Sequence, residues 1–303
     1  MSKKVNFLIK GASFRGTIYE PANLSEARGI VIFTHGLGYC ERQYKIDDRY
    51  FTDNGYLLVT YNLRGHGGNK SVWTLKDSVD DLVEIVTQVL GKYDFKNSQR
   101  LSVMGHSTGA LITLLACLKD KRIQAASIIT IVTCLRQSLF YWFESGHNQE
   151  VKKYFTEKGI LPPIIGRFLD DKKTFDLYCE KKIPLDQLEI PHRYGMLRSK
   201  SWNQFFNEIA YTEDIMDYAG KLTLPILFFR GEYDEVMNPQ KTEDLYNRIG
   251  NTKQNRLRIT KSRDHFQNDS WDFIETETIN FLNDLWKYSP IKIHKTTKTV
   301  LSE

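Results

Sequence analysis

Short, unbroken hydrophobic runs recur along the chain, and most of them are rich in β-branched residues. Such runs are typical of strands that are buried on both faces of a sheet. We expect buried strands at 30–34, 57–61, 101–104, 126–134, 225–230 and 257–260. The first segments, 5–9 and 14–20, are more typical of an antiparallel hairpin at the edge of the sheet.

Helical patterns separate these hydrophobic runs. In 78–91 the apolar residues recur three or four positions apart, which is the spacing of one face of a helix. Asp77 or Ser78 is available to cap the N-terminus of this helix. A second helix is expected directly after Ser107. Strands that alternate with helices predict an α/β fold with a mostly parallel central sheet flanked by helices.

The alternation of strands and helices stops between 135 and 220 and resumes afterwards. The interrupting stretch has a helical, aromatic and charged character and contains no clear strand. We therefore predict one α/β domain formed by 1–134 and 221–287, with 135–220 inserted as a helical cap, or lid. The last segment, 288–303, is polar and basic and is expected to be a mobile tail.

The formal net charge of +5 is concentrated at the two ends of the chain. Residues 1–10 and 287–303 carry +3 each, so the region between them carries −1. A near-neutral body lacks the clustered basic face that binds phosphate groups. The sequence therefore argues against a nucleic-acid-binding protein.

The hydrophobic runs are too short for a membrane protein or a secreted one. None approaches the roughly 18 apolar residues of a membrane-spanning helix, and the start of the chain lacks the apolar core of a signal peptide. The four cysteines show neither a C-x-x-C pair nor a regular spacing, so we expect reduced, mostly buried thiols. We predict a cytoplasmic protein without a membrane span, and its oligomeric state is left open.

The pentapeptide GHSTG at 105–109 predicts a nucleophilic serine, Ser107. The G-x-S-x-G pattern forms a sharp turn between a strand and a helix, which presents the hydroxyl above the sheet. Gly105 and Gly109 are needed because side chains at these positions would collide with neighbouring backbone. The preceding hydrophobic run and the following helical pattern supply the context that this turn requires.

A serine hydroxyl needs a base to remove its proton, and enzymes with this motif supply the partners in the order serine, acid, histidine. Asp234 follows the expected strand 225–230, and His265 follows the expected strand 257–260. We therefore predict Ser107 as nucleophile, His265 as base and Asp234 as the acid that orients His265. The neighbouring acids that remain alternatives to Asp234 are Glu232, Glu235 and Asp264.

Acyl transfer also requires donors for the oxyanion that forms on attack. One donor is expected to be the backbone N–H of Thr108, which follows the nucleophile. The second is assigned to the N–H of Leu37, in the Gly-rich loop after the strand 30–34. We expect the side chain of His35 to support this loop, and we consider a catalytic role for His66 a minor alternative because it precedes the serine.

Together these motifs resemble the monoacylglycerol-lipase-like and esterase branch of the α/β-hydrolase superfamily. The matching segments are HGLGYCERQY at 35–44, NLRGHG at 62–67, GHSTG at 105–109, PILFFRGEYDEV at 225–236 and RDHF at 263–266. The resemblance implies the α/β-hydrolase fold, with the predicted cap as its lid, and a serine hydrolase without a metal or cofactor. Fatty acyl thioesterases and acyltransferases are similar more weakly, which would add an acyl carrier as a partner.

The sequence departs from this family at two positions. The family usually has an acidic residue where Asn62 stands, and this difference is expected to loosen the loop around Arg64. The family often has methionine where Thr108 stands, which keeps the oxyanion N–H but changes the wall of the pocket. The cap shows no close match to the family, so the resemblance does not identify the substrate.

Aromatic residues of the expected cap suggest an apolar cleft for an acyl chain. The candidate substrate contacts are Phe140, Trp142, Phe143 and Phe206, although the same residues would also serve to pack the cap on the core. The sequence therefore predicts hydrolysis of a small-molecule carboxylic ester with a medium or long acyl chain. The alternatives are an acyl-thioester hydrolase, an acyltransferase, a peptidase or a non-catalytic ligand-binding protein.

Overall fold

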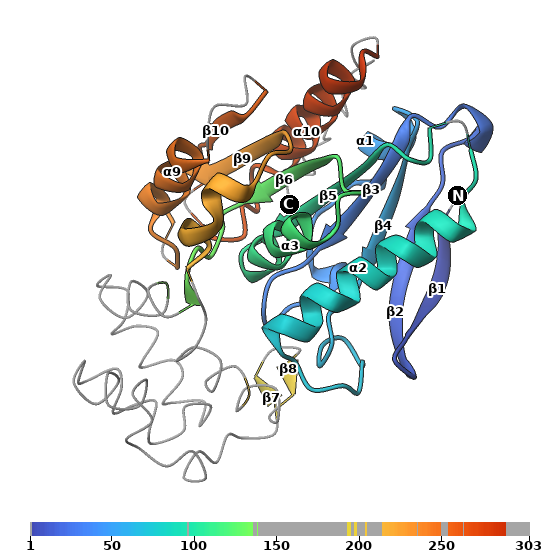
Figure 1. Cartoon of the computed structure of the whole chain (residues 1–303), viewed down its shortest axis with the longest axis horizontal. Helices are drawn as coiled ribbons and strands as arrows, with labels where there is room; N and C mark the ends of the chain where they lie inside the picture. The colour runs from blue at the N-terminus through green and yellow to red at the C-terminus, as the bar shows by residue number, and fades with distance from the viewer. Residues whose placement is uncertain are drawn as a thin grey trace, which may run out of the picture.

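The fold is built on one eight-stranded sheet (Figure 1). The computed structural model describes residues 2–95, 97–135, 138, 204, 214–234, 236–249, 254–262 and 264–288, and the backbone of 193–194 and 197–198. The strand order is β1-β2-β4-β3-β5-β6-β9-β10. These strands are β1 (Ser2–Ile9), β2 (Ala12–Tyr19), β3 (Gly29–Thr34), β4 (Tyr56–Tyr61), β5 (Leu101–His106), β6 (Ala125–Ile129), β9 (Ile226–Gly231) and β10 (Arg256–Thr260).

The sheet is parallel from β4 to β10 and antiparallel only at the edge formed by β1 and β2. All residues of β3, β4, β5 and β6 are buried, which explains why these strands are hydrophobic without polar alternation. The α/β-hydrolase fold predicted from the sequence is confirmed.

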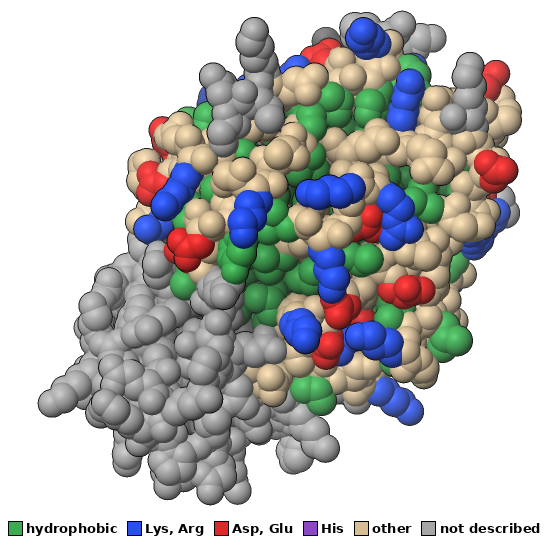
Figure 2. Space-filling model, in the orientation of Figure 1, with side chains coloured by type: hydrophobic (Ala, Val, Ile, Leu, Met, Phe, Trp, Pro, Cys, Tyr) green, Lys and Arg blue, Asp and Glu red, His purple; other side chains and the backbone are tan. Residues whose placement is uncertain are grey.

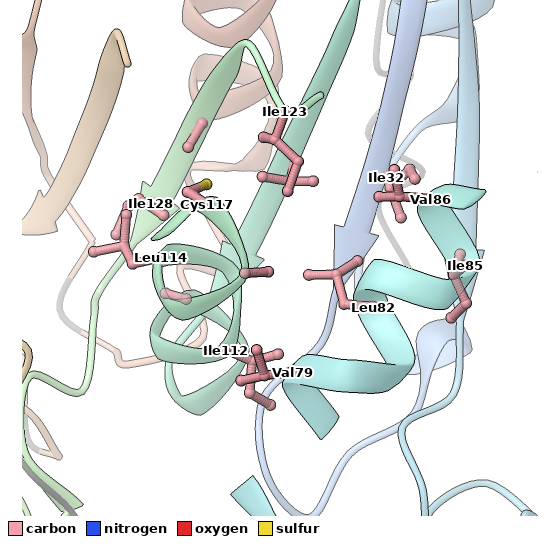
Figure 3. Close-up of a cluster of buried hydrophobic side chains, with 14 of the residues drawn as sticks. Ile32, Val79, Leu82, Ile85, Val86, Ile112, Leu114, Cys117, Ile123 and Ile128 are labelled. Carbon is pink, nitrogen blue, oxygen red and sulfur yellow. The ribbon is translucent and has the colours of Figure 1, made fainter. Parts of the chain in front are cut away.

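Helices cover both faces of the sheet. They are α1 (Asp48–Thr52), α2 (Leu75–Lys92), α3 (Thr108–Lys119), α9 (Pro239–Arg248) and α10 (Trp271–Trp286), with 3-10 turns η1 (Leu24–Glu26), η2 (Glu41–Gln43) and η4 (Ile215–Lys221). The residues of α2 and α3 share one core cluster with Ile32 of β3 (Figure 3). The adjacent Val31 and Phe33 lie in a second cluster with residues of α1 and α10. Successive residues of one strand thus enter opposite cores.

Three local predictions need correction. Helix α2 begins at Leu75, and Thr74 is its N-cap in place of Asp77 or Ser78, because its side chain accepts a hydrogen bond from the Asp77 N–H. Strand β6 ends at Ile129, although the hydrophobic run continues to Cys134. The stretch expected to lack strands contains a short antiparallel pair, β7 (Arg193–Tyr194) and β8 (Leu197–Arg198), which is too short to produce a periodic pattern.

The chain leaves the sheet after β6 and rejoins it at β9, and these two strands are parallel neighbours. Near this point the N–H of Ile215 donates to the carbonyl oxygen of Thr133, at 3.0 Å. Ile215 and Ala219 of η4 belong to the same core cluster as α2 and α3. Most of the predicted cap, 135–220, lies outside the described residues. Of the predicted tail, 288–303, only Tyr288 is described, and its hydroxyl donates to the carbonyl oxygen of Arg28 at 3.1 Å, so this residue is held on the domain.

The charged residues on the face shown in Figure 2 are mixed in sign, with basic side chains placed among acidic and uncharged ones. Asp80 on α2 forms ion pairs with both Lys10 and Lys119. Within the described part of the chain, no helix combines the length and the hydropathy that a membrane crossing requires.

Candidate active site

Ser107 occupies a sharp turn between β5 and α3. Its φ of 56° and ψ of −124° are uncommon for a residue with a side chain, and such strain is typical of a nucleophile elbow. A Cβ atom on Gly105 would lie 2.5 Å from the carbonyl oxygen of Gly109. A Cβ atom on Gly109 would overlap the backbone of Thr34 and His35. Both glycines of the motif are therefore required by close backbone contacts.

A continuous chain of hydrogen bonds connects Asp234, His265 and Ser107. His265 Nδ1 lies 2.9 Å from Asp234 Oδ2 and 3.1 Å from Oδ1, and His265 Nε2 lies 2.8 Å from Ser107 Oγ. Because a carboxylate only accepts, Nδ1 carries the proton and Nε2 is left to accept from the serine hydroxyl. The structure thus brings together the three residues predicted as nucleophile, base and acid.

The carboxylate of Asp234 is fixed at the end of β9. Its Oδ1 accepts hydrogen bonds from the backbone N–H groups of Val236, at 2.8 Å, and Met237, at 2.7 Å. Asp234 is 1% exposed and His265 is 3% exposed, so bulk water screens their interaction weakly. These contacts hold the carboxylate in the orientation that the imidazole requires.

The alternative acids and the alternative histidine occupy other positions. The side chain of Glu232 is exposed, and Asp264 accepts hydrogen bonds from Ser262 and Asn268. His66 donates from Nδ1 to the carbonyl oxygen of Arg64 and accepts at Nε2 from the N–H of Gly38. Both nitrogens of His66 are thus engaged in loop contacts. Glu235 lies outside the described residues.

The loop after β3 lies against the nucleophile. A Cβ atom on Gly36 would approach the Ser107 Cβ to 3.2 Å. The N–H of Gly36 donates to Tyr44 Oη at 2.8 Å, and the N–H of Gly38 donates to His66 Nε2 at 3.0 Å. Within the described part of the chain, the N–H of Leu37, between them, donates to no acceptor.

The orientation of the Leu37 N–H is set by the peptide unit to which it belongs. The carbonyl oxygen of Gly36, in the same peptide, accepts a hydrogen bond from His35 Nδ1 at 2.8 Å. In a trans peptide the C=O and N–H groups point in opposite directions. His35 therefore supports the loop as predicted, and it does so by fixing the peptide whose N–H is the candidate oxyanion donor.

The N–H of Thr108 is the other candidate donor, at the first residue of α3. The N–H of Ser107 donates to the carbonyl oxygen of Ile129, and that of Ala110 donates to the carbonyl oxygen of Ser107. For Thr108 no acceptor is found among the described residues. A helix N-terminus with an unpaired N–H favours negative charge, which suits an oxyanion.

Two buried histidines connect the loop after β3 with the loop after β4. His35 Nε2 accepts from the N–H of Leu63 at 2.9 Å, and His66 Nε2 accepts from the N–H of Gly38, so each loop binds the other. Burial lowers the pKa of His35 to about 4 and the pKa of His66 well below its ordinary value. Both side chains are therefore neutral at physiological pH, as their acceptor roles require.

Arg64 is firmly held, although Asn62 stands where the family resemblance led us to expect an acidic residue. Its Nε and Nη2 donate to the two carboxylate oxygens of Asp81 at 2.7 and 2.6 Å, and its Nη1 donates to Asp77 at 2.8 Å. Asn62 Oδ1 instead accepts from the N–H of Glu41 at 3.0 Å. The loosening expected around Arg64 is therefore absent, because α2 supplies the carboxylates.

Gln267, for which the sequence predicts no role, shapes the loop carrying His265. Gln267 is fully buried, has a φ of 57°, and donates from Nε2 to the carbonyl oxygen of Asp264 at 3.0 Å. Its Oε1 accepts from the hydroxyl of Thr260 at the end of β10. A lone glutamine in a polar loop carries no sequence signal for this role.

The predicted substrate contacts, Phe140, Trp142, Phe143 and Phe206, lie outside the described residues. No group of three or more His, Cys, Asp or Glu side chains is arranged to hold a metal ion in the described part of the chain. The described site therefore consists of the elbow, the acid–base pair and the N–H groups of Leu37 and Thr108.

Comparison with known proteins identifies the family and the fold of this chain. The sequence model of a hydrolase family described as serine aminopeptidase, S33, matches residues 25–265. Ethanol acetyltransferase 1 from Kluyveromyces marxianus is 24% identical over 249 residues, which cover 71% of this chain. The aligned region spans only 64% of that relative's own length.

Solved structures share the fold at low sequence identity. The α/β hydrolase GrgF from Penicillium sp. sh18 superposes with a TM-score of 0.68 at 17% identity, covering 95% of this chain and 100% of the other. An esterase from Pyrococcus furiosus superposes with a TM-score of 0.64 at 17% identity, covering 94% and 90%. At these identities the comparison establishes the fold alone.

Proposed function

The chain belongs to the hydrolase family described as serine aminopeptidase, S33, and from this premise we propose that it is a serine hydrolase that cleaves carboxylic esters through an acyl-enzyme. The observation that carries the proposal is the unbroken hydrogen-bond chain from Asp234 through His265 to Ser107. A base held by a carboxylate next to a serine at an elbow is the arrangement that activates a hydroxyl for attack on a carbonyl.

In the first half-reaction, His265 Nε2 takes the proton of the Ser107 hydroxyl while Oγ attacks the carbonyl carbon of the ester. The carbonyl oxygen becomes an oxyanion, which accepts hydrogen bonds from the N–H groups of Leu37 and Thr108. The tetrahedral intermediate then breaks its bond to the alkoxy oxygen. His265 returns the proton to that oxygen, the alcohol leaves, and the acyl group stays on Ser107.

In the second half-reaction a water molecule replaces the alcohol. His265 Nε2 removes a proton from the water, and the resulting hydroxide attacks the acyl carbon. The same N–H groups stabilise the second oxyanion. Its collapse breaks the bond to Ser107 Oγ, which recovers its proton from His265, and the carboxylic acid is released. Asp234 keeps the imidazole in one tautomer and stabilises its positive charge throughout.

A second candidate reaction is transfer of the acyl group to an alcohol. The acyl-enzyme is common to both reactions, and only the second nucleophile differs. The similarity to an ethanol acetyltransferase supports this alternative. The same half-reaction would also serve an acyl thioester, with an acyl carrier as partner, or a peptide bond, as the family description suggests.

The acyl chain is proposed to be of medium or long length. This part of the proposal rests on the sequence of the predicted cap, where Phe140, Trp142, Phe143 and Phe206 supply apolar surface. Apolar side chains around a buried nucleophile favour an aliphatic substrate. The chain-length dependence of the reaction tests it directly.

We would measure hydrolysis of p-nitrophenyl esters from acetate to myristate, with Ser107→Ala and Ser102→Ala as variants. Ser102 is a matched control because it also lies on β5 and is fully buried. We expect Ser107→Ala to abolish turnover and labelling by a fluorophosphonate, and Ser102→Ala to keep both. An optimum between octanoate and myristate would support the proposed chain length, and an optimum at acetate would contradict it.

Adding ethanol to the same reaction separates hydrolysis from transfer. A hydrolase releases the free acid, whereas a transferase converts a rising share of the acyl group to the ethyl ester. If wild-type protein is neither labelled nor active on esters, thioesters or peptides, the proposal of a serine hydrolase is wrong.

A further inference from the structure

Tyr44 is joined by hydrogen bonds to the loop of the candidate oxyanion donor and to the strand of the nucleophile. Its Oη accepts from the N–H of Gly36 at 2.8 Å and lies 2.8 Å from His106 Nδ1. His106 directly precedes Ser107, at the end of β5. Tyr44 itself follows the 3-10 turn η2 and has no part in the hydrogen bonds between Asp234, His265 and Ser107.

The other nitrogen of His106 connects to the loop that carries the base. His106 Nε2 lies 2.8 Å from the carbonyl oxygen of His265. A carbonyl oxygen only accepts, so Nε2 of His106 carries a proton. Burial holds the pKa of His106 well below its ordinary value, so this imidazole is neutral and its Nδ1 has a free lone pair.

These constraints assign a direction to every hydrogen bond. The Gly36 N–H donates to the Tyr44 oxygen, the Tyr44 O–H donates to His106 Nδ1, and the His106 Nε2–H donates to the His265 carbonyl. Burial raises the pKa of Tyr44, so the phenol keeps the proton that it donates. The Tyr44 phenol and the His106 imidazole each accept one hydrogen bond and donate the next.

Aromatic neighbours fix the position of the Tyr44 ring. It makes edge-to-face contacts with Phe33, at a centroid distance of 5.0 Å, and with Trp271, at 5.6 Å. Phe33 belongs to β3, and Trp271 begins α10. Ring pairs of this geometry favour one position of the side chain, so the hydroxyl is held within hydrogen-bond distance of Gly36 and His106.

We propose that Tyr44 is a positioning residue, which sets the Gly36–Leu37 segment relative to Ser107 and His265 through a relay that ends on His106. This inference rests on the proposed function of the site. The relay links three segments whose relative positions must be kept during turnover. These are the Gly36–Leu37 segment, the end of β5 and the loop of His265. Without the phenolic oxygen, the Gly36 N–H and His106 Nδ1 both lose their partner.

The test is Tyr44→Phe, which keeps the ring and removes the oxygen. We expect kcat on a p-nitrophenyl ester to fall between tenfold and a hundredfold, with KM changed less than threefold, since loss of a whole oxyanion donor costs about 10² to 10³ in kcat. Tyr56→Phe is the matched control. Tyr56 is fully buried and its Oη donates to Asn283 at 2.9 Å, so this variant also loses a buried hydrogen bond and should keep kcat.

A double-mutant cycle tests the relay itself. In His106→Gln the amide nitrogen can replace Nε2 as donor to the His265 carbonyl, while the acceptor for Tyr44 is lost. If both residues act through one relay, the double variant with Tyr44→Phe is no slower than the slower single variant. If the two rate factors multiply instead, the relay is refuted.

Two further outcomes are distinguishable. If Tyr44→Phe keeps kcat within twofold of wild type and only its Tm falls, Tyr44 is merely structural and the inference is wrong. If wild-type protein is neither labelled by a fluorophosphonate nor active on esters, thioesters or peptides, the proposed function is wrong, and the inference about Tyr44 is wrong with it. Should Tyr44→Phe not fold, His106→Gln alone gives the result, because a kcat within twofold of wild type would overturn the relay.

Discussion

Glu275 offers a stability measurement that is independent of catalysis. Its side chain is fully buried on α10, where Oε1 accepts from the N–H of Asp47 at 2.7 Å. Oε2 has no partner among the described residues. Burial, with smaller effects from the carboxylates of Asp47, Asp272 and Asp48, raises the pKa of Glu275 to about 9. The folded protein therefore holds this carboxyl in its neutral form at pH 7.

The consequence for stability follows from linkage. The unfolded chain releases this proton near pH 4.5, the ordinary value for a glutamate, whereas the folded chain keeps it until about pH 9. Between these values the folded state binds more protons, so the free energy of unfolding decreases as the pH rises. The expected slope is about 1.4 kcal/mol per pH unit, or about 3 kcal/mol between pH 5 and pH 7.

Glu275→Gln removes this dependence because an amide does not titrate. At pH 5 the variant is expected to be up to about 1 kcal/mol less stable than wild type, since its amide brings one more N–H without an acceptor. At pH 7 and above it should be the more stable protein. Urea unfolding at half-unit intervals from pH 5 to 8 measures the difference between the two proteins.

Glu26→Gln is the control, because Glu26 is exposed on the 3-10 turn η1. Its stability difference from wild type should stay constant over this pH range. If the difference between Glu275→Gln and wild type is equally constant, Glu275 does not bind its proton more tightly in the folded state, and the reasoning from burial is refuted.

Two further predictions concern the site and the loop beside it. Asp234→Asn should keep the fold and lower kcat about 10⁴-fold, because His265 then adopts the wrong tautomer. The rate of ester hydrolysis measures this effect, and a decrease in kcat of less than tenfold would exclude Asp234 as the acid. Arg64→Met should lower the free energy of unfolding by about 3 kcal/mol or more, because it leaves the buried Asp81 carboxylate without its partner. Urea unfolding measures that loss, and a change below 1 kcal/mol would show that Asp81 is satisfied without Arg64.

The central strands could be predicted from the sequence because a strand that is buried on both faces has an almost unbroken run of hydrophobic residues. Strand β4, for example, has every residue buried and therefore reads as a continuous hydrophobic run. The run after residue 126 exceeds its strand for the same reason. Val132 and Cys134 are buried although they lie beyond the end of β6. A hydrophobic run indicates which residues are buried, and it does not indicate where the hydrogen bonds of the strand end.

The candidate triad could be predicted because its residues follow three strands of the sheet in a fixed order. Ser107 follows β5, Asp234 follows β9 and His265 follows β10, and parallel strands bring their carboxyl ends to one edge. The relay through Tyr44 could not be predicted in this way. Tyr44 lies in an irregular segment after η2 and contacts His106, which is 62 positions away in the sequence, and local periodicity does not encode such a contact.

The helix cap illustrates a competition that the sequence alone does not resolve. Thr74, Asp77 and Ser78 all have side chains that suit an N-cap. Asp77 is instead drawn into the ion pair with Arg64, and the Ser78 hydroxyl donates to the carbonyl oxygen of Thr74 at 2.5 Å. A tertiary contact of Asp77 and a local contact of Ser78 thus leave Thr74 as the N-cap of the helix.

The hydrogen bond from Ile215 to Thr133 has a consequence for how this protein can change over evolutionary time. It closes the chain on itself at the point where the polypeptide departs from β6 and returns towards β9. The two ends of the segment 134–214 are therefore held side by side, next to the paired strands β6 and β9. That segment can accordingly be lengthened, shortened or exchanged without altering the pairing of Ala126 with Ile226 in the sheet. Changes in this segment can therefore accumulate while the strands that precede Ser107, Asp234 and His265 keep their places in the sheet.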